Sequence, residues 1–424
     1  MLKRPDTVRL NTAGIPNEKF VELDVKRGLR NADGSGVLAG LTQVCGVIGS
    51  RAGVACDGEL TYRGISIEKL APQLGMHQHN KFEAVCFLLL IGRLPNPEEL
   101  AWICQEIGKR RQLSDALVAH AIKGLPSTSV MNKLEIAIAA LYGEDSDPDT
   151  LDPDANFERS LDLIAKFATI TAFSYLIQTN PNAKLVNAPA TMSQAEAFLY
   201  MLREGQAATE LEIEILDLCL LLHAEHGGGN NSTFATRVTT SSGTDIYSSI
   251  VAGIASLKGP LHGAANKMVM EMMDEIKSQV KNWSDRAEIK AYLAAIFNKT
   301  AGDKSGKIYG LGHAVYTKSD PRATVLNKQA DQLAQEKGRM DEYQLYLAIA
   351  ELGPEVFKEL KGSDKIIAPN VDFFSGFVYD CLGIPEAVYT PMFAMARISG
   401  WCAHRIEEIT SGRRIIRPSY KFVG

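Results

Sequence analysis

The stretch TELEIEILDLCLLLHAEHGGGNNS, residues 209–232, joins a helical segment to a polar, glycine-rich one. Its apolar side chains recur at steps of four, three and four, at Leu211, Ile215, Leu218 and Leu222. This is the spacing of one face of an α-helix. Thr209 with Glu212 has the form of a capping box, which closes a helix at its first turn. The stretch therefore predicts a helix over 209–223.

The same periodicity dominates the chain after about residue 80. Further helices are predicted over 97–111, 130–142, 157–177, 193–204, 245–257, 266–276, 286–297, 321–337, 343–352 and 391–409. Strand-like alternation is confined to short pieces near the N-terminus, such as Glu59–Tyr62. The predicted fold class is mainly α. No linker marks a domain joint, so we expect any second domain to be inserted into the first.

Composition excludes several classes of protein. Among the 424 residues, 45 Lys and Arg stand against 50 Asp and Glu, and the formal net charge of −5 argues against a nucleic-acid binder. With 46% hydrophobic and 22% charged residues, the chain can bury a large core. The longest apolar run, 84–91, is too short for a bilayer, which takes about 20 residues. We expect a soluble protein without a membrane partner.

The first residues and the cysteines bear on location. The opening MLKRPDTVRLNTAG, residues 1–14, has no apolar core and no cleavage-like site, so we expect a cytoplasmic protein. The seven cysteines are odd in number and dispersed, and they include no C-x-x-C pair. We expect them to be reduced and mostly buried.

Four polar clusters interrupt the helical sequence, and the first is His223-Ala-Glu-His226 with the glycines after it. Two histidines three apart share a helix face, which could indicate a metal, but the metalloprotease pattern needs a spacing of four. The glycines suit a helix end. The residues alone leave both interpretations open.

The second cluster, KGPLHGAAN (258–266), holds His262 between two glycines just before a predicted helix. Backbone amides at a helix start disfavour an imidazolium, so we expect His262 to stay neutral and able to donate a hydrogen bond. The plainer interpretation is an N-cap histidine in a tight turn.

The third cluster is YGLGHAVY (309–316) with SDPR (319–322). Asp320 before Pro321 is a helix-start signature, so Arg322 falls in the first turn, where a guanidinium and free amides together form an anion site. His313 lies nine residues before Arg322. The pair suggests a ligand that has both a carbonyl and a carboxylate.

The fourth cluster, NVDFFSG (370–376), places Asp372 among apolar neighbours, which would raise its pKa toward that of a usable base. The plainer interpretation is an N-cap aspartate. Neutral histidines, one carboxylate and several arginines suit the enolisation of a carbonyl compound followed by attack on an anionic acceptor.

These clusters, with DGELTYRGISIEKLA (57–71) and AMARISGWCAHRIEEI followed by RIIRP near the C-terminus, resemble the citrate synthase family in order and spacing over nearly the whole chain. The resemblance implies an almost all-α fold with a large helical domain, 1–265 plus 370–424, and a smaller inserted one, 266–369. It implies condensation of acetyl-CoA with oxaloacetate and water to citrate and CoA, without a metal. It also implies no permanently bound cofactor, the coenzyme A thioester being a co-substrate, and a homodimer with shared active sites.

The resemblance also assigns roles to residues. In similar enzymes the counterpart of His262 hydrogen-bonds the thioester oxygen, that of Asp372 removes the methyl proton, and that of His313 polarises the ketone of oxaloacetate. The residues implied to bind oxaloacetate are His226, Arg322, Arg397 and Arg417, the last from the partner subunit. The implied coenzyme A contacts are Lys307, Gly310 and Gly312. Some similar enzymes are 2-methylcitrate synthases that take propionyl-CoA, so acyl specificity stays open.

Two interpretations from other classes compete with this one. A metalloenzyme would use His223, Glu225 and His226 and would need a further ligand. A non-catalytic helical scaffold would account for the helices but not for four polar clusters whose groups suit an aldol-type condensation.

Overall fold

The computed structural model describes residues 17–24, 28–29, 31, 36–51, 54–74, 79–313, 315–362, 366–412 and 414–422. The chain divides into two compact units, Met1–Leu41 with Ile416–Gly424, and Thr42–Ile415. In the first unit the one helix among the described residues is α1 (Asn17–Glu22). The opening segment 1–14, on which the targeting prediction rests, lies outside the described residues. All candidate site residues except Arg417 belong to the second unit.

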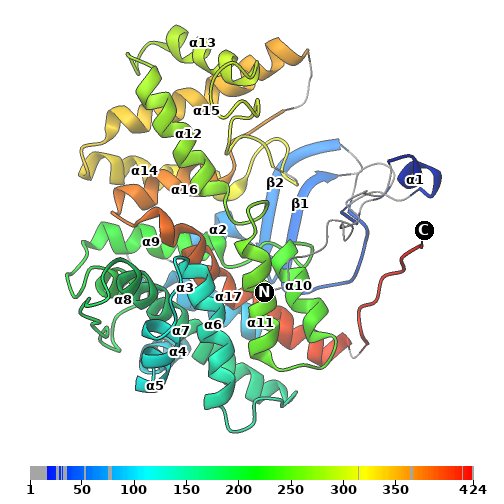
Figure 1. The fold of residues 1–424 in the computed structure, drawn as a ribbon, viewed down its shortest axis with the longest axis vertical. Coiled ribbons are helices and arrows are strands. Elements are labelled where there is room, and N and C mark those ends of the chain that lie inside the picture. The colour runs from blue at the N-terminus through cyan, green and yellow to red at the C-terminus, as the bar shows by residue number, and fades with distance from the viewer. Residues whose placement is uncertain are drawn as a thin grey trace, which may run out of the picture. The chain divides into compact units, whose positions relative to one another are not determined.

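The second unit carries the sheet and the remaining named helices (Figure 1). The strands are β1 (Cys45–Arg51), β2 (Val54–Tyr62) and β3 (Ile65–Ser66). The helices are α2 (Ile67–Gln73), α3 (Lys81–Ile91), α4 (Pro97–Arg110), α5 (Asp115–Leu117), η1 (Val118–Lys123), α6 (Val130–Ala140), η2 (Leu141–Glu144), α7 (Pro153–Thr179), α8 (Gln194–Leu202), α9 (Glu210–His223), α10 (Asn231–Thr240), α11 (Ile246–Lys258), α12 (Ala265–Gln279), α13 (Arg286–Phe297), α14 (Pro321–Glu336), α15 (Met340–Lys361), α16 (Val371–Cys381), η3 (Glu386–Val388), α17 (Tyr389–Glu407) and η4 (Glu408–Gly412).

The mainly α prediction is confirmed. Each predicted helix is present, and the largest difference is in α15, which continues through Pro354 to Lys361. The strand predicted at Glu59–Tyr62 is the second half of β2, which pairs antiparallel with β1 and β3. The seven cysteines are free and five of them are buried, as predicted.

Among the α-helices of ten or more residues, the sequence analysis missed three, each for a physical reason. Helix α3 is buried on nearly every face, so its apolar residues form a continuous run without helical periodicity. Helix α10 is rich in threonine, which has a low helix propensity. Helix α16 begins within the NVD motif, whose residues were interpreted as catalytic and not as the start of a helix.

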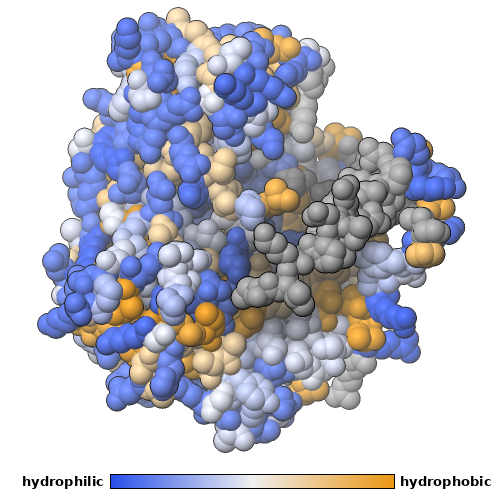
Figure 2. Space-filling model, viewed as in Figure 1, coloured by the Kyte–Doolittle hydropathy of each residue, from blue (hydrophilic) through white to orange (hydrophobic). Residues whose placement is uncertain are grey.

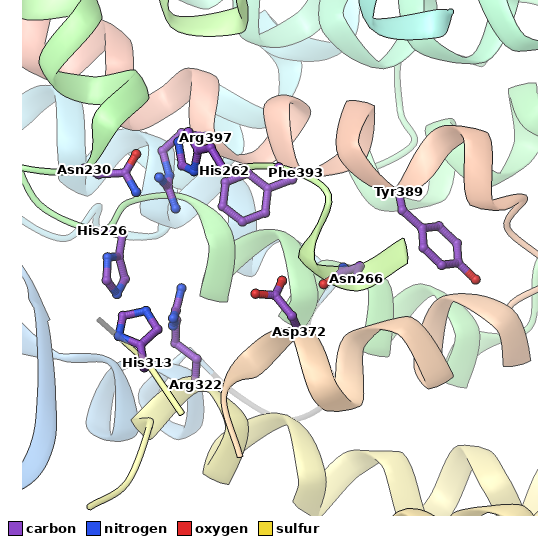
Figure 3. A pocket seen from close by; sticks show the side chains of 11 residues that line it. His226, Asn230, His262, Asn266, His313, Arg322, Asp372, Tyr389, Phe393 and Arg397 are labelled. Atoms are coloured by element: carbon purple, nitrogen blue, oxygen red, sulfur yellow. The ribbon is translucent and has the colours of Figure 1, made fainter. Parts of the chain in front are cut away.

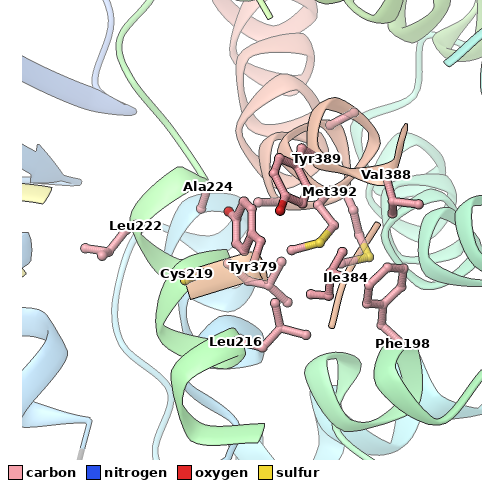
Figure 4. Packing of buried hydrophobic residues seen from close by; sticks show 14 of the residues in the cluster. Phe198, Leu216, Cys219, Leu222, Ala224, Tyr379, Ile384, Val388, Tyr389 and Met392 are labelled. Carbon is pink, nitrogen blue, oxygen red and sulfur yellow. The ribbon is translucent and has the colours of Figure 1, made fainter. Parts of the chain in front are cut away.

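Helix α9 lies at the centre of the core. The predicted capping box is present, because Glu212 N donates to Thr209 Oγ1 at 3.2 Å and Thr209 N donates to Glu212 Oε2 at 3.0 Å. The helix contacts α17, α8, α14 and α3, and its side chains from Ile215 to His223 are all buried (Figure 4). The predicted single apolar stripe was therefore too narrow, since a helix that is buried on all sides is apolar on all sides.

Helix α7 is long and apolar enough to cross a membrane by length and composition, but 83% of its most apolar window is buried inside the protein, as expected of a core helix. The surface over α12–α15 is mostly hydrophilic on the face shown in Figure 2. The hydrophobic residues visible on this face lie mainly in the lower half of the view in Figure 2.

The arrangement of the second unit brings distant segments together. Helices α12, α13, α14 and α15 gather above α9 in Figure 1. Helix α14 contacts α9, β2 and α16, so the segment that carries His313 and Arg322 meets the end of α9 and the start of α16. The four polar clusters of the sequence converge at this junction.

Candidate active site

Residues from all four polar clusters line one cavity of about 100 Å³ (Figure 3). Its lining residues are His226, Asn230, His262, Gly263, Asn266, His313, Arg322, Asp372, Tyr389, Phe393 and Arg397. Six of these were predicted from the sequence, and they come from all four clusters and from α17. Residues up to 171 positions apart in the chain therefore share one site.

Two buried arginines give the cavity its positive charge. Arg397 donates from Nε to His223 O at 2.9 Å, and its Nη1 and Nη2 are buried without a hydrogen-bond partner among the described residues. Its guanidinium lies over the ring of Phe393 at 4.7 Å from the centroid. Two N–H-bearing nitrogens held free in a buried cavity form a binding site for a carboxylate.

Arg322 is paired within its own helix start. Its Nε and Nη2 donate to Asp320 Oδ1 and Oδ2 at 3.1 and 2.8 Å, and its backbone N donates to Asp320 Oδ1 at 3.0 Å. The predicted combination of guanidinium and free amides is therefore wrong in one part, because the capping carboxylate of Asp320 occupies the amide. Burial alone would lower the pKa of Arg322, but Asp320 raises it above its usual value.

The contacts of His313 determine which nitrogen carries its proton. Its Nδ1 accepts from Val315 N at 3.0 Å and from Tyr316 N at 3.1 Å, so the proton of the neutral ring lies on Nε2. Burial and the nearby Arg322 lower the pKa of His313 to about 4. His313 is therefore a neutral hydrogen-bond donor at pH 7, directed from Nε2.

His262 is also neutral, although for another reason than predicted. Helix α12 begins at Ala265 with Ala264 as N-cap, so His262 precedes the helix and is not its cap. Burial and then Arg397 lower the pKa of His262 to about 4. Its Nε2 lies 3.1 Å from Ser232 Oγ, which also accepts from Trp401 Nε1 at 3.3 Å and so fixes the imidazole against α10 and α17.

The HAEH cluster divides into a site residue and two structural ones. His226 lines the cavity, and burial followed by Arg322 holds its pKa well below the usual value. His223 donates from Nδ1 to Cys219 O at 2.8 Å, within α9. Glu225 contacts His404 Nε2 at 3.0 Å and accepts from Gly227 N at 2.6 Å. No group of three metal-ligating side chains occurs among the described residues.

Asp372 faces the cavity from the first turn of α16. The N-cap interpretation is wrong, because Asn370 is the cap and its Oδ1 accepts from Asp372 N at 3.0 Å. The Asp372 carboxylate is thus left for the cavity. Burial raises the pKa of Asp372 to about 6, with Arg322 opposing the rise. At pH 7 it is mostly ionised and a stronger base than an exposed aspartate.

The remaining predicted residues do not line the cavity. Lys307 is exposed, and Gly310 and Gly312 are partly buried in the loop before His313. Gly310 has φ +80°, and a Cβ there would meet Phe373 at 2.7 Å, which explains the glycine by close packing. Arg417 lies in the C-terminal part of the first unit, Ile416–Gly424, and is exposed in the single chain.

The sequence analysis missed five lining residues. Asn230, Gly263 and Asn266 lie inside motifs that it quoted, and their nearness to a histidine was the available signal. Tyr389 and Phe393 lie on α17, two turns and one turn before Arg397, where an aromatic is indistinguishable from core sequence.

The chain is similar in sequence to known proteins over most of its length. Residues 32–419 match the family model described as citrate synthase, C-terminal domain. The chain belongs to the citrate synthase family. It is 38% identical over 369 residues to the citrate synthase of Deinococcus radiodurans, covering 87% of this chain and 90% of that one. It is 37% identical over 341 residues to the citrate/2-methylcitrate synthase of Bacillus subtilis, covering 80% and 84%.

A solved citrate synthase structure agrees with the fold. The ternary complex of the Thermoplasma acidophilum enzyme with carboxymethyl coenzyme A and oxaloacetate superposes with a TM-score of 0.76 at 30% identity, covering 92% of this chain and 94% of that one. The two-domain, mainly α citrate synthase fold is thus confirmed for this chain.

Proposed function

We propose that this member of the citrate synthase family condenses acetyl-CoA with oxaloacetate and water to give citrate and CoA. The observation that carries the proposal is the cavity itself. A carboxylate with a pKa of about 6 and three neutral histidines line it together with two buried arginines. Family membership supports the reaction class, an acyl transfer in which the acyl group becomes an alkyl group.

In this proposal oxaloacetate binds to the cationic side of the cavity. The free Nη1 and Nη2 of Arg397 receive one carboxylate, and Arg322 binds the other. His313 donates from Nε2 to the ketone oxygen, because its Nδ1 is occupied by backbone amides. His226, buried beside His313 with ring centroids 5.3 Å apart, completes the contact surface.

The acyl group is activated between Asp372 and His262. Asp372 removes a proton from the methyl carbon, and His262 hydrogen-bonds the thioester oxygen as negative charge develops there. A thioester methyl is a weak acid, so the carboxylate alone is insufficient, and one well-placed donor contributes about 3–4 kcal/mol. His262 can fill this role because burial and Arg397 keep it neutral.

Carbon–carbon bond formation follows from these positions. The enolate carbon attacks the ketone carbon of oxaloacetate, and the proton on His313 Nε2 passes to the developing alkoxide. The proton that Asp372 took from the methyl carbon restores the neutral His313. Water then cleaves the thioester of the citryl-CoA intermediate and releases citrate and CoA. Exclusion of water until the bond has formed prevents early hydrolysis of the thioester.

The proposal also divides the chain into functional parts. Residues 266–369 form the small domain of the family fold and carry His313 and Arg322, and residues 1–265 with 370–424 form the large domain. Coenzyme A lies against the loop with Lys307, Gly310 and Gly312. The acyl-CoA is a substrate, and no cofactor stays bound.

We further propose a cytoplasmic homodimer in which Arg417 completes the partner's site. An acceptor with two carboxylates needs several guanidinium groups, and two of the three predicted arginines line this cavity while Arg417 is exposed in the single chain. Seven free cysteines agree with a reducing compartment.

Mixed dimers test the shared site. Asp372→Asn and Arg417→Ala subunits are each expected to be inactive, and they are mixed under conditions that exchange chains. A heterodimer has one site with both defects and one with neither, so about half the activity per dimer should return. If mass spectrometry shows heterodimers and no activity returns, Arg417 does not serve the neighbour's site.

The alternative acyl substrate is propionyl-CoA, because a relative at 37% identity is a citrate/2-methylcitrate synthase. One methylene in an apolar pocket is worth only about 1–3 kcal/mol of discrimination. The test measures CoA release with oxaloacetate and either acetyl-CoA or propionyl-CoA, with oxaloacetate omitted as the control. A higher kcat/KM for acetyl-CoA supports citrate synthase, a higher one for propionyl-CoA supports 2-methylcitrate synthase, and oxaloacetate-independent release contradicts both.

A further inference from the structure

Tyr316 packs against three of the residues assigned to oxaloacetate, although it does not line the cavity. Its ring stacks on His313, with centroids 4.8 Å apart and an interplanar angle of 24°. The ring of His226 meets it edge-on at 5.4 Å and 87°. The guanidinium of Arg322 lies over the same ring at 5.7 Å from the centroid. One aromatic side chain therefore contacts all three groups.

The rings form a closed triangle. His226 and His313 are themselves 5.3 Å apart at 68°, so each ring of the set of three contacts the other two. In such a cluster no ring can turn without displacing another, because protein interiors are close-packed. The plane of His313, and with it the direction of its Nε2–H, depends on the position of the Tyr316 ring.

Tyr316 is itself held from behind by the β1–β2 hairpin. A Cβ on Gly58 would meet Tyr316 Cδ1 at 2.6 Å, and a Cβ on Gly49 would meet Val315 O at 2.0 Å. Thr317 Oγ1 donates to Gly49 O at 3.1 Å. The glycines let the hairpin approach closely, so the Tyr316 ring is fixed between the hairpin and the two histidines.

The contacts of Tyr316 with the site residues are made by its ring and not by its hydroxyl group. Tyr316 is 2% exposed, and its hydroxyl oxygen is buried without a hydrogen-bond partner in the part of the chain that the structure describes. A buried hydroxyl without a partner contributes no favourable contact. Stacking, edge-on packing and the cation–π contact all use the ring.

We propose that Tyr316 is a positioning residue for oxaloacetate, whose ring sets the orientation of His313, His226 and Arg322 together. The inference rests on the proposed function, since it takes these three residues as the oxaloacetate site. Tyr316 acts through its neighbours and makes no contact with the substrate. A loss of the ring should therefore weaken oxaloacetate binding and ketone polarisation more than acyl-CoA binding.

The test compares Tyr316→Met and Tyr316→Phe with the wild type. Methionine is apolar, close to tyrosine in size and without a ring plane, whereas phenylalanine keeps the ring. Tyr343→Met is the matched control, because Tyr343 is 4% exposed and stacks on Phe377 without contacting a site residue. Michaelis constants for both substrates, kcat, and calorimetric binding of oxaloacetate alone are measured for each folded protein.

Tyr316→Met is expected to raise the oxaloacetate KM and Kd at least about tenfold and to lower kcat, with less than about a threefold change in the acyl-CoA KM. Tyr316→Phe should stay within about twofold of the wild type in every constant. Tyr343→Met should lower the melting temperature and leave both Michaelis constants unchanged.

A second variant addresses the ring from the hairpin side. Gly58→Ala places a methyl group against Ser319 O and Tyr316 Cδ1, so it presses on the turn and on the ring, and it should also raise the oxaloacetate KM. Its control is Gly143→Ala, since a Cβ on Gly143 meets nothing within 4 Å. This comparison gives a result even where Tyr316→Met fails to fold.

Three results would overturn the proposal. They are an oxaloacetate KM unchanged in Tyr316→Met, an equal loss in Tyr316→Phe and Tyr316→Met, and equal changes in the two Michaelis constants. An inactive wild type would instead overturn the proposed function, so the two failures are distinguishable.

Discussion

Two regions of the protein bury a pair of carboxyl groups. In the core, Glu83 on α3 lies near Asp217 on α9, and beside the cavity Asp320 lies near Asp372, which lines it. Burial raises the pKa of Asp217 and of Asp372, each to about 6. The shift is therefore the same in a structural and in a candidate catalytic carboxyl group.

The surroundings distinguish the two regions. Asp217 accepts from Lys81 N and Phe82 N at 2.8 and 2.9 Å, so its oxygens close the first turn of α3. Glu83 accepts from Gln194 N at 2.7 Å. The Asp372 carboxylate does not cap a helix, because Asn370 caps α16. It does not pair with Arg322 either, because Asp320 forms that ion pair. A raised pKa indicates a site only where the carboxylate faces a cavity and is spared from capping.

The largest expected effect is on catalysis in the cavity. Asp372→Asn should fold normally and lose turnover by about a thousandfold, because an amide cannot accept the methyl proton. Exchange of the acetyl methyl protons with solvent, followed by NMR with an oxaloacetate analogue, should vanish in parallel. Asp217→Asn is the control at the other buried aspartate, and its turnover should stay near that of the wild type. Near-normal turnover and exchange in Asp372→Asn would show that another group is the base.

The next effect is on stability in the core. Asp217→Ala leaves the amides of Lys81 and Phe82 without an acceptor, at a cost of about 1–3 kcal/mol for each buried group. Urea unfolding at fixed protein concentration should show the loss, while kcat per folded protein stays unchanged. A lowered kcat with unchanged stability would remove the distinction between the two regions.

The pH dependence of kcat/KM should also distinguish the cavity from the core. Since the pKa of Asp372 is about 6 and the base must be ionised, kcat/KM for the acyl-CoA should rise about tenfold per pH unit below 6 and level off above it. His262 and His313, with pKa values of about 4, stay neutral over this range. A profile that is flat down to about pH 5 would contradict the assignment of Asp372 as the base.

The smallest expected effect is on stability, which should fall as pH rises, whereas kcat/KM rises with pH. Burial, followed by Asp217, raises the pKa of Glu83 above its unfolded value, so the folded state holds the proton more tightly and the free energy of unfolding falls as pH rises. Glu83→Gln removes this dependence and keeps an acceptor for Gln194 N. The variant should therefore gain stability relative to the wild type as the pH is raised from about 5 to about 8. A difference that does not change with pH would show that Glu83 does not titrate on folding.

Much of the candidate site was predictable because its residues stand in short motifs. His262, His313 and Asp372 each interrupt an apolar or glycine-rich sequence, where a polar side chain needs a special reason. Arg397 lies within a helix that is otherwise core sequence, so the resemblance to the family carried its prediction. The CoA contacts, the domain limits and the shared Arg417 stay predictions.

Other features could not be predicted from local sequence. The proton of His313 lies on Nε2 because two backbone amides of the following turn point at Nδ1. The neutrality of His262 comes from burial and from Arg397, which is 135 positions away in the chain. The stacking of Tyr316 on His313 likewise depends on how the turn packs against the hairpin.

The sequence by itself determined the mainly α class, most of the helices and the identity of the chemical groups, because periodicity, caps and side-chain chemistry are local properties. The tertiary structure decided which carboxylate faces the cavity, which imidazole nitrogen bears the proton and which pKa values shift. These depend on burial and on charges and amides brought from distant segments, and such distances do not exist until the chain has folded.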